Sequence, residues 1–190
     1  LEKANDINQV LAIEGKTWGL FYSGFKYFLE EDFIINKRVK RPPDNPMNAL
    51  ISFGNTLLYT KTIAEIYQTH LEQSISFLHE PSESRFSLSL DLSEVFKPVI
   101  VYKTIFELVN NKKIKVEKHF NPDVNYSLLN DEGKKVFIDA YENRLNQTIE
   151  HPVLNRKITY KQAIKLDGYK LIKYITEGQE FTPFYLGDKK

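Results

Sequence analysis

The sequence predicts an all-α fold, because the hydrophobic residues of several long segments recur at helical spacing. Two helix-start signals support this prediction. Asn45 and Pro46 are residue types preferred at a helix N-cap and at the first helical position, and Thr159 with Gln162 forms a capping-box pattern. With 190 residues and 42% hydrophobic content, the chain is long enough to build one sizeable core. We therefore expect a single helical bundle-like domain over residues 1–190.

The composition excludes several classes of protein. The chain has no cysteine, which rules out disulfides, thiolate zinc sites and cysteine nucleophiles and fits a reducing cytoplasm. No apolar run approaches transmembrane length, and the first ten residues lack the features of a signal peptide, so we expect a cytoplasmic protein without a membrane partner. The chain also opens in a helical pattern without an initiator methionine, which suggests a fragment of a longer protein.

The first predicted helix covers residues 8–28 and carries an acidic residue within its apolar stripe. Glu14 lies between Leu11 and Trp18, and burying an unpaired carboxylate there would cost several kcal/mol, roughly. A salt bridge or a position at the edge of the stripe is the ordinary explanation, and a metal is the alternative. The stripe consists of Ile7, Leu11, Trp18, Phe21, Phe25 and Phe28.

Residues 30–46 are predicted to form a loop, since three prolines interrupt the helical pattern. This loop carries a basic cluster, which would bind a phosphate backbone or belong to a solvated linker, the commoner explanation of such a run. The cluster is Lys37, Arg38, Lys40 and Arg41.

A second helix is expected from Pro46 to about residue 70. Besides its apolar side it has a polar stripe, which either faces solvent or lines a site and hydrogen-bonds the ligands there. The pattern slightly favours the solvent-facing interpretation. The stripe consists of Asn48, Ser52, Asn55 and Tyr59.

Residues 78–98 combine a histidine with two acids. His79 precedes a turn, and Asp91 and Glu94 are neighbours on a helix surface because they are three residues apart. An imidazole and carboxylates that converge on one point suggest a metal site. We expect a third helix over residues 87–111, with a short strand at its start as the alternative, and a bend at Pro98, which cannot donate to the carbonyl of Glu94.

The remaining segments are predicted from their apolar spacing and their capping pattern. Residues 112–129 are expected to form a loop with a short extended piece, residues 131–149 an amphipathic helix, and residues 160–177 the last helix. The apolar tail, residues 181–186, should pack back onto the protein. His70, His119 and His151 are assigned surface or structural roles.

Four phrases match one known family. They are AIEGKTWGLFY (residues 12–22), RPPDNPMNALISFGNTLLY (41–59), LHE (78–80) and SLSLDLSEVFKP (87–98). Together they resemble the C-terminal helical catalytic domain of the CRISPR-associated integrase of the adaptation module, also described as a metal-dependent DNA endonuclease. In that family a β-rich N-terminal domain precedes this one, so the resemblance implies a fragment that lacks it.

The resemblance implies a metal site between the first helix and the third, with Glu14, His79 and Glu94 as ligands. Asp91 would bind the metal directly, hold a metal-bound water or orient His79. Two carboxylates and an imidazole without a thiolate suit Mn²⁺ and accept Mg²⁺. The basic cluster would bind DNA near this site, with Arg85 and Lys97 as further candidates.

The function implied is insertion of short foreign DNA segments into a CRISPR array, in adaptive antiviral defence. Attack by a DNA 3′-hydroxyl would give strand transfer and attack by water would give cleavage, and the sequence leaves both open. The expected partners are double-stranded DNA, a second copy in a homodimer of the full-length protein, and a second small adaptation-module protein. Two alternatives are a non-catalytic DNA-binding or complex-assembly domain and a hydrolase of small phosphoesters.

Overall fold

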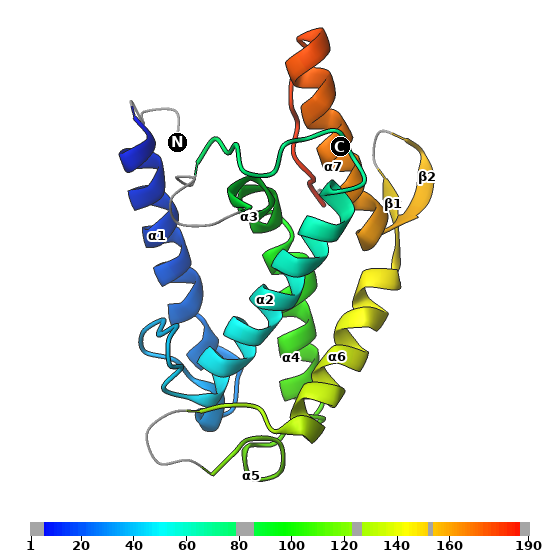
Figure 1. The fold of residues 1–190 in the computed structure, drawn as a ribbon. Helices are drawn as coiled ribbons and strands as arrows, with labels where there is room; N and C mark the ends of the chain where they lie inside the picture. Colours follow the sequence, from blue (N-terminus) through cyan, green and yellow to red (C-terminus); the bar gives the residue numbers. More distant parts are fainter. Residues whose placement is uncertain (1–5, 79–85, 123–126, 152–153, 187–190) are drawn as a thin grey trace. The chain divides into compact units, whose positions relative to one another are not determined.

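The structure, a computed structural model, describes residues 6–78, 86–122, 127–151 and 154–186. The chain forms two compact units, and Figure 1 shows the order of their elements. Unit 1 comprises Leu1–Phe53 and Ile105–Ile138, and unit 2 comprises Gly54–Thr104 and Asp139–Lys190. Helices α2 (Pro46–Ile66) and α6 (Asp131–Asn146) each run from one unit into the other.

Unit 1 begins with α1 (Ile7–Ser23), which the carboxylate of Asp6 caps by accepting the backbone N–H of Gln9 at 2.8 Å. The helix ends earlier than predicted and is followed by the 3₁₀ turns η1 (Phe25–Tyr27) and η2 (Glu31–Phe33). None of the residues of α1 is fully buried, whereas Phe25 just after it is. The expected core-facing stripe is therefore only partly buried.

Helix α2 begins where the sequence predicted, because the Asn45 side chain accepts the backbone N–H of Asn48 at 2.8 Å. It ends at Ile66, four residues before the expected end. The loop predicted over residues 112–129 contains the short helix α5 (Val116–His119), which the sequence analysis missed. The expected extended piece is an isolated antiparallel bridge between Phe120 and Leu129.

The predicted third helix is interrupted. Helix α3 (Ser87–Glu94) stops at the proposed ligand, the π-helical segment η3 (Lys97–Tyr102) follows, and α4 (Lys103–Asn110) completes the run. Pro98 lies at the start of η3, where its missing N–H removes the bond that would continue the α-helix. The helical interpretation is confirmed and the strand alternative is wrong, but in place of the expected bend at Pro98 the α-helix is interrupted.

The described chain is mostly helical, as the all-α prediction expects, and a short two-stranded antiparallel sheet is added to it. Strands β1 (Thr148–His151) and β2 (Arg156–Thr159) pair with Ile149 opposite Ile158, so α6 ends at Asn146 instead of continuing to residue 149. Helix α7 (Tyr160–Glu177) then begins with the predicted capping box of Thr159 and Gln162, and it ends at Glu177 as expected. Gly178 caps it in the left-handed conformation that glycine favours.

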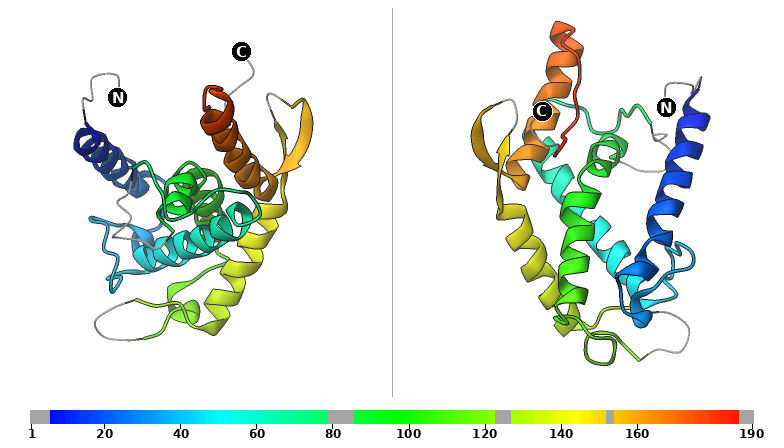
Figure 2. Two further views of the ribbon diagram at one scale, coloured as in Figure 1. Left: turned by 45° about the horizontal axis from the view of Figure 1, so that its top comes forward. Right: turned by 180° about the vertical axis from the view of Figure 1, so that it is seen from behind.

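The core of unit 2 lies between α2, α3 and α7. Ile66, Leu88, Leu92 and Leu171 form a buried cluster, and an added Cβ on Gly168 would lie only 2.7 Å from the Ile66 side chain. After α7 the chain turns back and runs alongside this helix (Figures 1 and 2). The ring of Phe184 stacks on Phe96 with centroids 4.9 Å apart, which confirms that the apolar tail packs back.

Candidate active site

Helix α3 carries two of the predicted site residues and is largely buried, with Leu90 and Glu94 half-buried. Its polar and apolar residues are buried alike, and the polar side chains have partners within unit 2. The hydroxyl of Ser87 donates to the carbonyl of Ser74 at 3.1 Å, and that of Ser89 donates to the side-chain oxygen of Gln73. These bonds fasten the start of α3 to the segment that precedes it in the sequence.

Asp91, one turn further along α3, binds the same preceding segment. Its carboxylate is 6% exposed, and Oδ2 accepts the backbone N–H groups of Phe77 at 3.0 Å and Leu78 at 2.9 Å. These two residues directly precede His79, which lies outside the described residues. Asp91 therefore holds the backbone that leads into the predicted histidine ligand.

Glu94 lies at the end of α3 and is incompletely satisfied. Its Oε1 pairs with the ammonium group of Lys97, and the two side chains are 17% and 15% exposed. Its Oε2 is buried and accepts no hydrogen bond from any residue that the structure describes. Because a buried carboxylate oxygen is costly to leave unpaired, this atom is the one in α3 that a cation would stabilise.

Glu14 is held by a contact within its own helix. It is half-buried in α1, and its Oε1 accepts the indole N–H of Trp18 at 3.3 Å, one turn along the same helix. Trp18 in turn stacks on Tyr22, with ring centroids 5.8 Å apart. The half-buried position fits the edge of the stripe, the ordinary explanation of this glutamate, and the partial exposure lowers the free-energy cost of its charge.

The predicted metal ligands belong to separate parts of the molecule. Glu14 lies in unit 1, Glu94 lies in unit 2, and His79 is outside the described residues. Within the described ranges, no group of three or more His, Asp and Glu residues is arranged to hold a metal ion. The three-residue ligand set therefore stays a prediction.

One cation of the basic cluster is hydrogen-bonded to the protein, and the other three are exposed. Arg38 is half-buried, and its guanidinium donates to the Asn48 side chain and to the Ser52 hydroxyl, both at 2.9 Å. Lys37, Lys40 and Arg41 are exposed. Arg38 thus ties the loop to the first turns of α2, while the other three cations remain accessible to a phosphate.

The polar stripe of α2 does not face solvent, which corrects the favoured interpretation. Asn48 is fully buried, Ser52 and Tyr59 are half-buried, and the side-chain oxygen of Asn55 is buried without a hydrogen-bond partner in the described chain. The Tyr59 hydroxyl lies 3.5 Å from the carbonyl of Phe86, next to the start of α3. Among the other proposed DNA contacts, Lys97 pairs with Glu94, and Arg85 lies outside the described residues.

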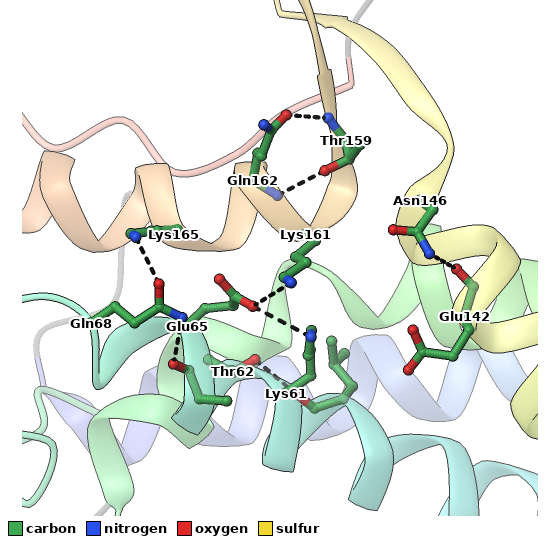
Figure 3. A network of polar contacts seen from close by, with 12 residues as sticks. Lys61, Thr62, Glu65, Gln68, Glu142, Asn146, Thr159, Lys161, Gln162 and Lys165 are labelled. Atoms are coloured by element: carbon green, nitrogen blue, oxygen red, sulfur yellow. Dashed lines mark hydrogen bonds and ion pairs between the residues drawn. The ribbon is translucent and has the colours of Figure 1, made fainter.

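Unit 2 also contains buried charges that the sequence analysis did not single out. Glu65 on α2 is 4% exposed and lies between Lys61 and Lys161 (Figure 3). Asp167 on α7 is 1% exposed, pairs with Lys170 at 2.8 Å and accepts the backbone N–H of Phe184 at 2.7 Å. Burial raises the pKa of the Asp167 carboxyl, and the Lys170 ammonium opposes this shift.

The three histidines assigned no ligand role fit that expectation. His119 and His151 are buried, and each accepts a backbone N–H through Nδ1, from Lys115 at 2.8 Å and from Leu154 at 3.1 Å. Burial, and then the charge of Lys170, lowers the pKa of the His151 imidazole. His70 is exposed. Both buried histidines therefore act as structural hydrogen-bond acceptors.

Solved structures share this fold. A Cas1 protein from Thermotoga maritima has a TM-score of 0.86 at 42% identity, over 95% of this chain and 56% of that one. A casposase bound to an integration product has a TM-score of 0.87 at 20% identity, over 100% of this chain and 56% of that one. The fold is thus the helical domain that these proteins contain.

Sequence comparisons identify the family. The family described as "CRISPR associated protein Cas1" matches residues 1–143, so the chain belongs to the Cas1 family. The CRISPR-associated endonuclease Cas1 3 of Thermodesulfovibrio yellowstonii is 46% identical over 94% of this chain and 54% of that protein. The CRISPR-associated endonuclease Cas1 of Clostridium perfringens is 46% identical over 96% of this chain and 56% of that protein. The chain thus spans about half the length of the curated relatives it matches.

None of the described helices is long and apolar enough to cross a membrane.

Proposed function

We propose that this chain is the catalytic part of a divalent-metal-dependent DNA endonuclease and integrase that inserts short foreign DNA segments into a CRISPR array. Membership of the Cas1 family supports the proposal, together with the endonuclease names of relatives that are 46% identical. The observation within the molecule that carries it is Glu94, whose buried Oε2 has no partner in the described chain. A carboxylate in this state is suited to bind a cation.

The residues fit Mn²⁺ or Mg²⁺, with Glu14, His79 and Glu94 as the ligand set. Carboxylate oxygens and one imidazole, in a chain without cysteine, match the preferences of these ions better than those of zinc. When bound, such an ion would polarise a phosphoryl oxygen and stabilise the charge that develops in phosphodiester chemistry.

The protein side chains supply positioning. Asp91 holds the backbone of Phe77 and Leu78, and through it the start of the segment that carries His79. Of the three roles open to Asp91, its two backbone bonds favour an orienting one. The ammonium group of Lys97 compensates the charge of the half-buried Glu94. The main role proposed for Lys97 is therefore to hold Glu94, and contact with DNA is a lesser one.

Partners follow from the relatives. The solved "Cas6-RT-Cas1--Cas2 complex" shares the fold of this chain, with a TM-score of 0.80 at 22% identity, and the casposase is bound to an integration product. We propose double-stranded DNA, a second copy of the full-length protein and a Cas2 protein as partners here. Lys37, Lys40 and Arg41 would bind DNA phosphates, because they are exposed.

The test uses the full-length protein, supercoiled DNA and a labelled duplex, with Mn²⁺ or Mg²⁺ added. Nicking and strand transfer should fall by about 100-fold or more in Glu14→Ala and in Glu94→Ala, because each change removes a ligand. Glu142→Ala is the matched control, since Glu142 is an exposed carboxylate on α6. Mn²⁺ binding, followed by electron paramagnetic resonance, should weaken in the two ligand variants and not in the control.

Full activity in both ligand variants would show that the site is assigned wrongly. If the wild-type protein bound DNA but neither bound metal nor cut DNA with any divalent ion, the non-catalytic DNA-binding alternative would replace the proposal.

A further inference from the structure

A small basic groove lies where the β1–β2 hairpin meets the start of α7, entirely within unit 2. Its volume is about 220 Å³, and we call it the hairpin groove. Three of its lining residues are cations, none is a carboxylate, and Ile158 and Leu166 supply apolar surface. The lining residues are Arg156, Lys157, Ile158, Gln162, Lys165, Leu166 and Tyr169.

Two of the three cations are free to bind a ligand. Arg156 and Lys157 are exposed on β2, and neither forms an ion pair or a side-chain hydrogen bond with any residue in the described ranges. The only acid opposite them in the strand register is Glu150, which faces Lys157. One carboxylate cannot neutralise both cations, so the hairpin keeps an excess of positive charge.

Two lysines near the start of α7, Lys161 and Lys165, add to this excess, and Figure 3 shows their contacts. The ammonium group of Lys165 donates to the side-chain oxygen of Gln68 at 2.8 Å, and this neutral acceptor leaves the charge of the lysine uncompensated. Lys161 shares the single carboxylate of Glu65 with Lys61, so this trio also carries one net positive charge. Asp167, further along α7, is buried and paired with Lys170.

A surface with this chemistry binds a chain of phosphates. Uncompensated Lys and Arg side chains along a groove gain affinity by releasing the counterions that surround a nucleic acid. A neutral or basic protein segment would leave these cations desolvated without partners. We infer that the hairpin groove is a second contact for the DNA backbone, in addition to the basic cluster of unit 1. This inference rests on the proposed function.

The salt dependence of DNA binding tests this inference, because each lost phosphate contact lowers the slope of log K against log salt by about 0.9. The full-length protein and its Arg156→Ala/Lys157→Ala variant would be titrated with a fluorescent duplex between about 50 and 200 mM NaCl. We expect the slope to fall by about 2 in the variant, with weaker binding at every salt concentration. The charge-retaining variant Arg156→Lys/Lys157→Arg should keep the slope of the wild type.

A second pair of lysines provides the matched control. Lys118 and Lys134 in unit 1 are exposed and paired with Glu132 and Asp131, so Lys118→Ala/Lys134→Ala changes the net charge equally without touching the groove. Its slope should equal that of the wild type. Equal slopes in the hairpin variant and the wild type would overturn the inference, as would equal losses in the hairpin and control variants.

Nicking of the same duplex by the wild-type protein separates the two proposals. A wild-type protein that nicks DNA while the hairpin variant keeps its salt slope refutes the groove and leaves the proposed function standing. A lowered slope in the hairpin variant, with no nicking by the wild type under any divalent ion, supports the DNA contact and refutes the catalytic function.

Discussion

Helices α1 and α3 both present carboxylates proposed to bind a metal, but they hold them differently. Helix α1 has no fully buried residue, and Glu14 has Trp18 of the same helix as its hydrogen-bond donor. Most residues of helix α3 are buried, and the Asp91 carboxylate accepts two backbone N–H groups from a segment 13 and 14 residues away in sequence. The α3 side of the proposed site is therefore built by tertiary structure and the α1 side by local contacts.

The groups whose pKa is shifted mainly by burial lie in unit 2, where the exposed Glu72 is an exception, because hydrogen bonds from Ser74 lower its pKa. Burial is the first cause of the shifted pKa of Tyr141, His151, Tyr160 and Asp167, and all four lie in unit 2. The shifted group in the described part of unit 1 is Glu132, whose pKa the hydrogen bond from Lys118 lowers. Unit 2 thus encloses its ionisable groups more than unit 1 does, and a buried carboxylate that has partners there, such as Asp91 with two backbone N–H groups, should contribute to the stability of that unit.

The largest effect on stability is expected from Asp91→Ala. The substitution leaves the N–H groups of Phe77 and Leu78 without their acceptor, so the free energy of unfolding should fall by about 2–3 kcal/mol. Urea denaturation followed by circular dichroism measures the change. Asp6→Ala is the matched control on α1, where an exposed carboxylate accepts one backbone N–H and the side-chain amide of the same residue, Gln9, and there we expect about 0.5–1 kcal/mol. Equal losses in both variants would contradict the contrast between the helices.

A smaller effect should appear in the pH dependence of unfolding. The folded protein holds His151 neutral, since its pKa is lowered and its Nδ1 accepts the N–H of Leu154. The unfolded chain therefore binds the proton more readily. The contribution of His151 to the free energy of unfolding is fully present above the pKa of the unfolded state, about 6.5. This contribution is lost as the pH falls through the lower pKa of the folded state.

In His151→Asn, stability should vary less between about pH 5 and pH 7.5 than in the wild type, because the titrating imidazole is gone. Asp167, Lys170 and Arg156 all influence His151, and all three remain in this variant. His70→Asn, at an exposed position, should leave the wild-type pH dependence unchanged. An unchanged profile in His151→Asn would show that burial in unit 2 does not govern its protonation.

The sequence predicted those parts of the fold that depend on local chemistry. The caps at Asn45 and at Thr159 with Gln162 placed the starts of α2 and α7, and Pro98 placed the interruption after α3. The β1–β2 hairpin was missed because its strands have four residues each, and Ile149 also fits the apolar side of α6 continued. A strand this short is defined by its partner across the ladder, which spacing along one segment does not reveal.

The same distinction applies to the candidate site. Asp91 and Glu94 were found because they lie one turn apart on a single helix. The solvent-facing interpretation of Asn48 and Ser52 failed because their partner is Arg38, from a loop 10 and 14 residues away in sequence. The burial of Asp91 likewise depends on the backbone of Phe77 and Leu78, which a helical pattern cannot indicate.

The smallest effect on stability is expected from Glu14→Gln. The amide oxygen still accepts the indole N–H of Trp18, and the side chain is half-buried, so unfolding should change by less than about 0.5 kcal/mol. The same variant should lose Mn²⁺ binding if Glu14 is a ligand, because an amide lacks the charge that offsets dehydration of the ion. Glu14 would then contribute to metal binding and not to folding, as expected for a side chain whose hydrogen-bond donor lies in its own helix. A loss of stability as large as that of Asp91→Ala would instead show that Glu14 is enclosed as tightly as the carboxylates of α3.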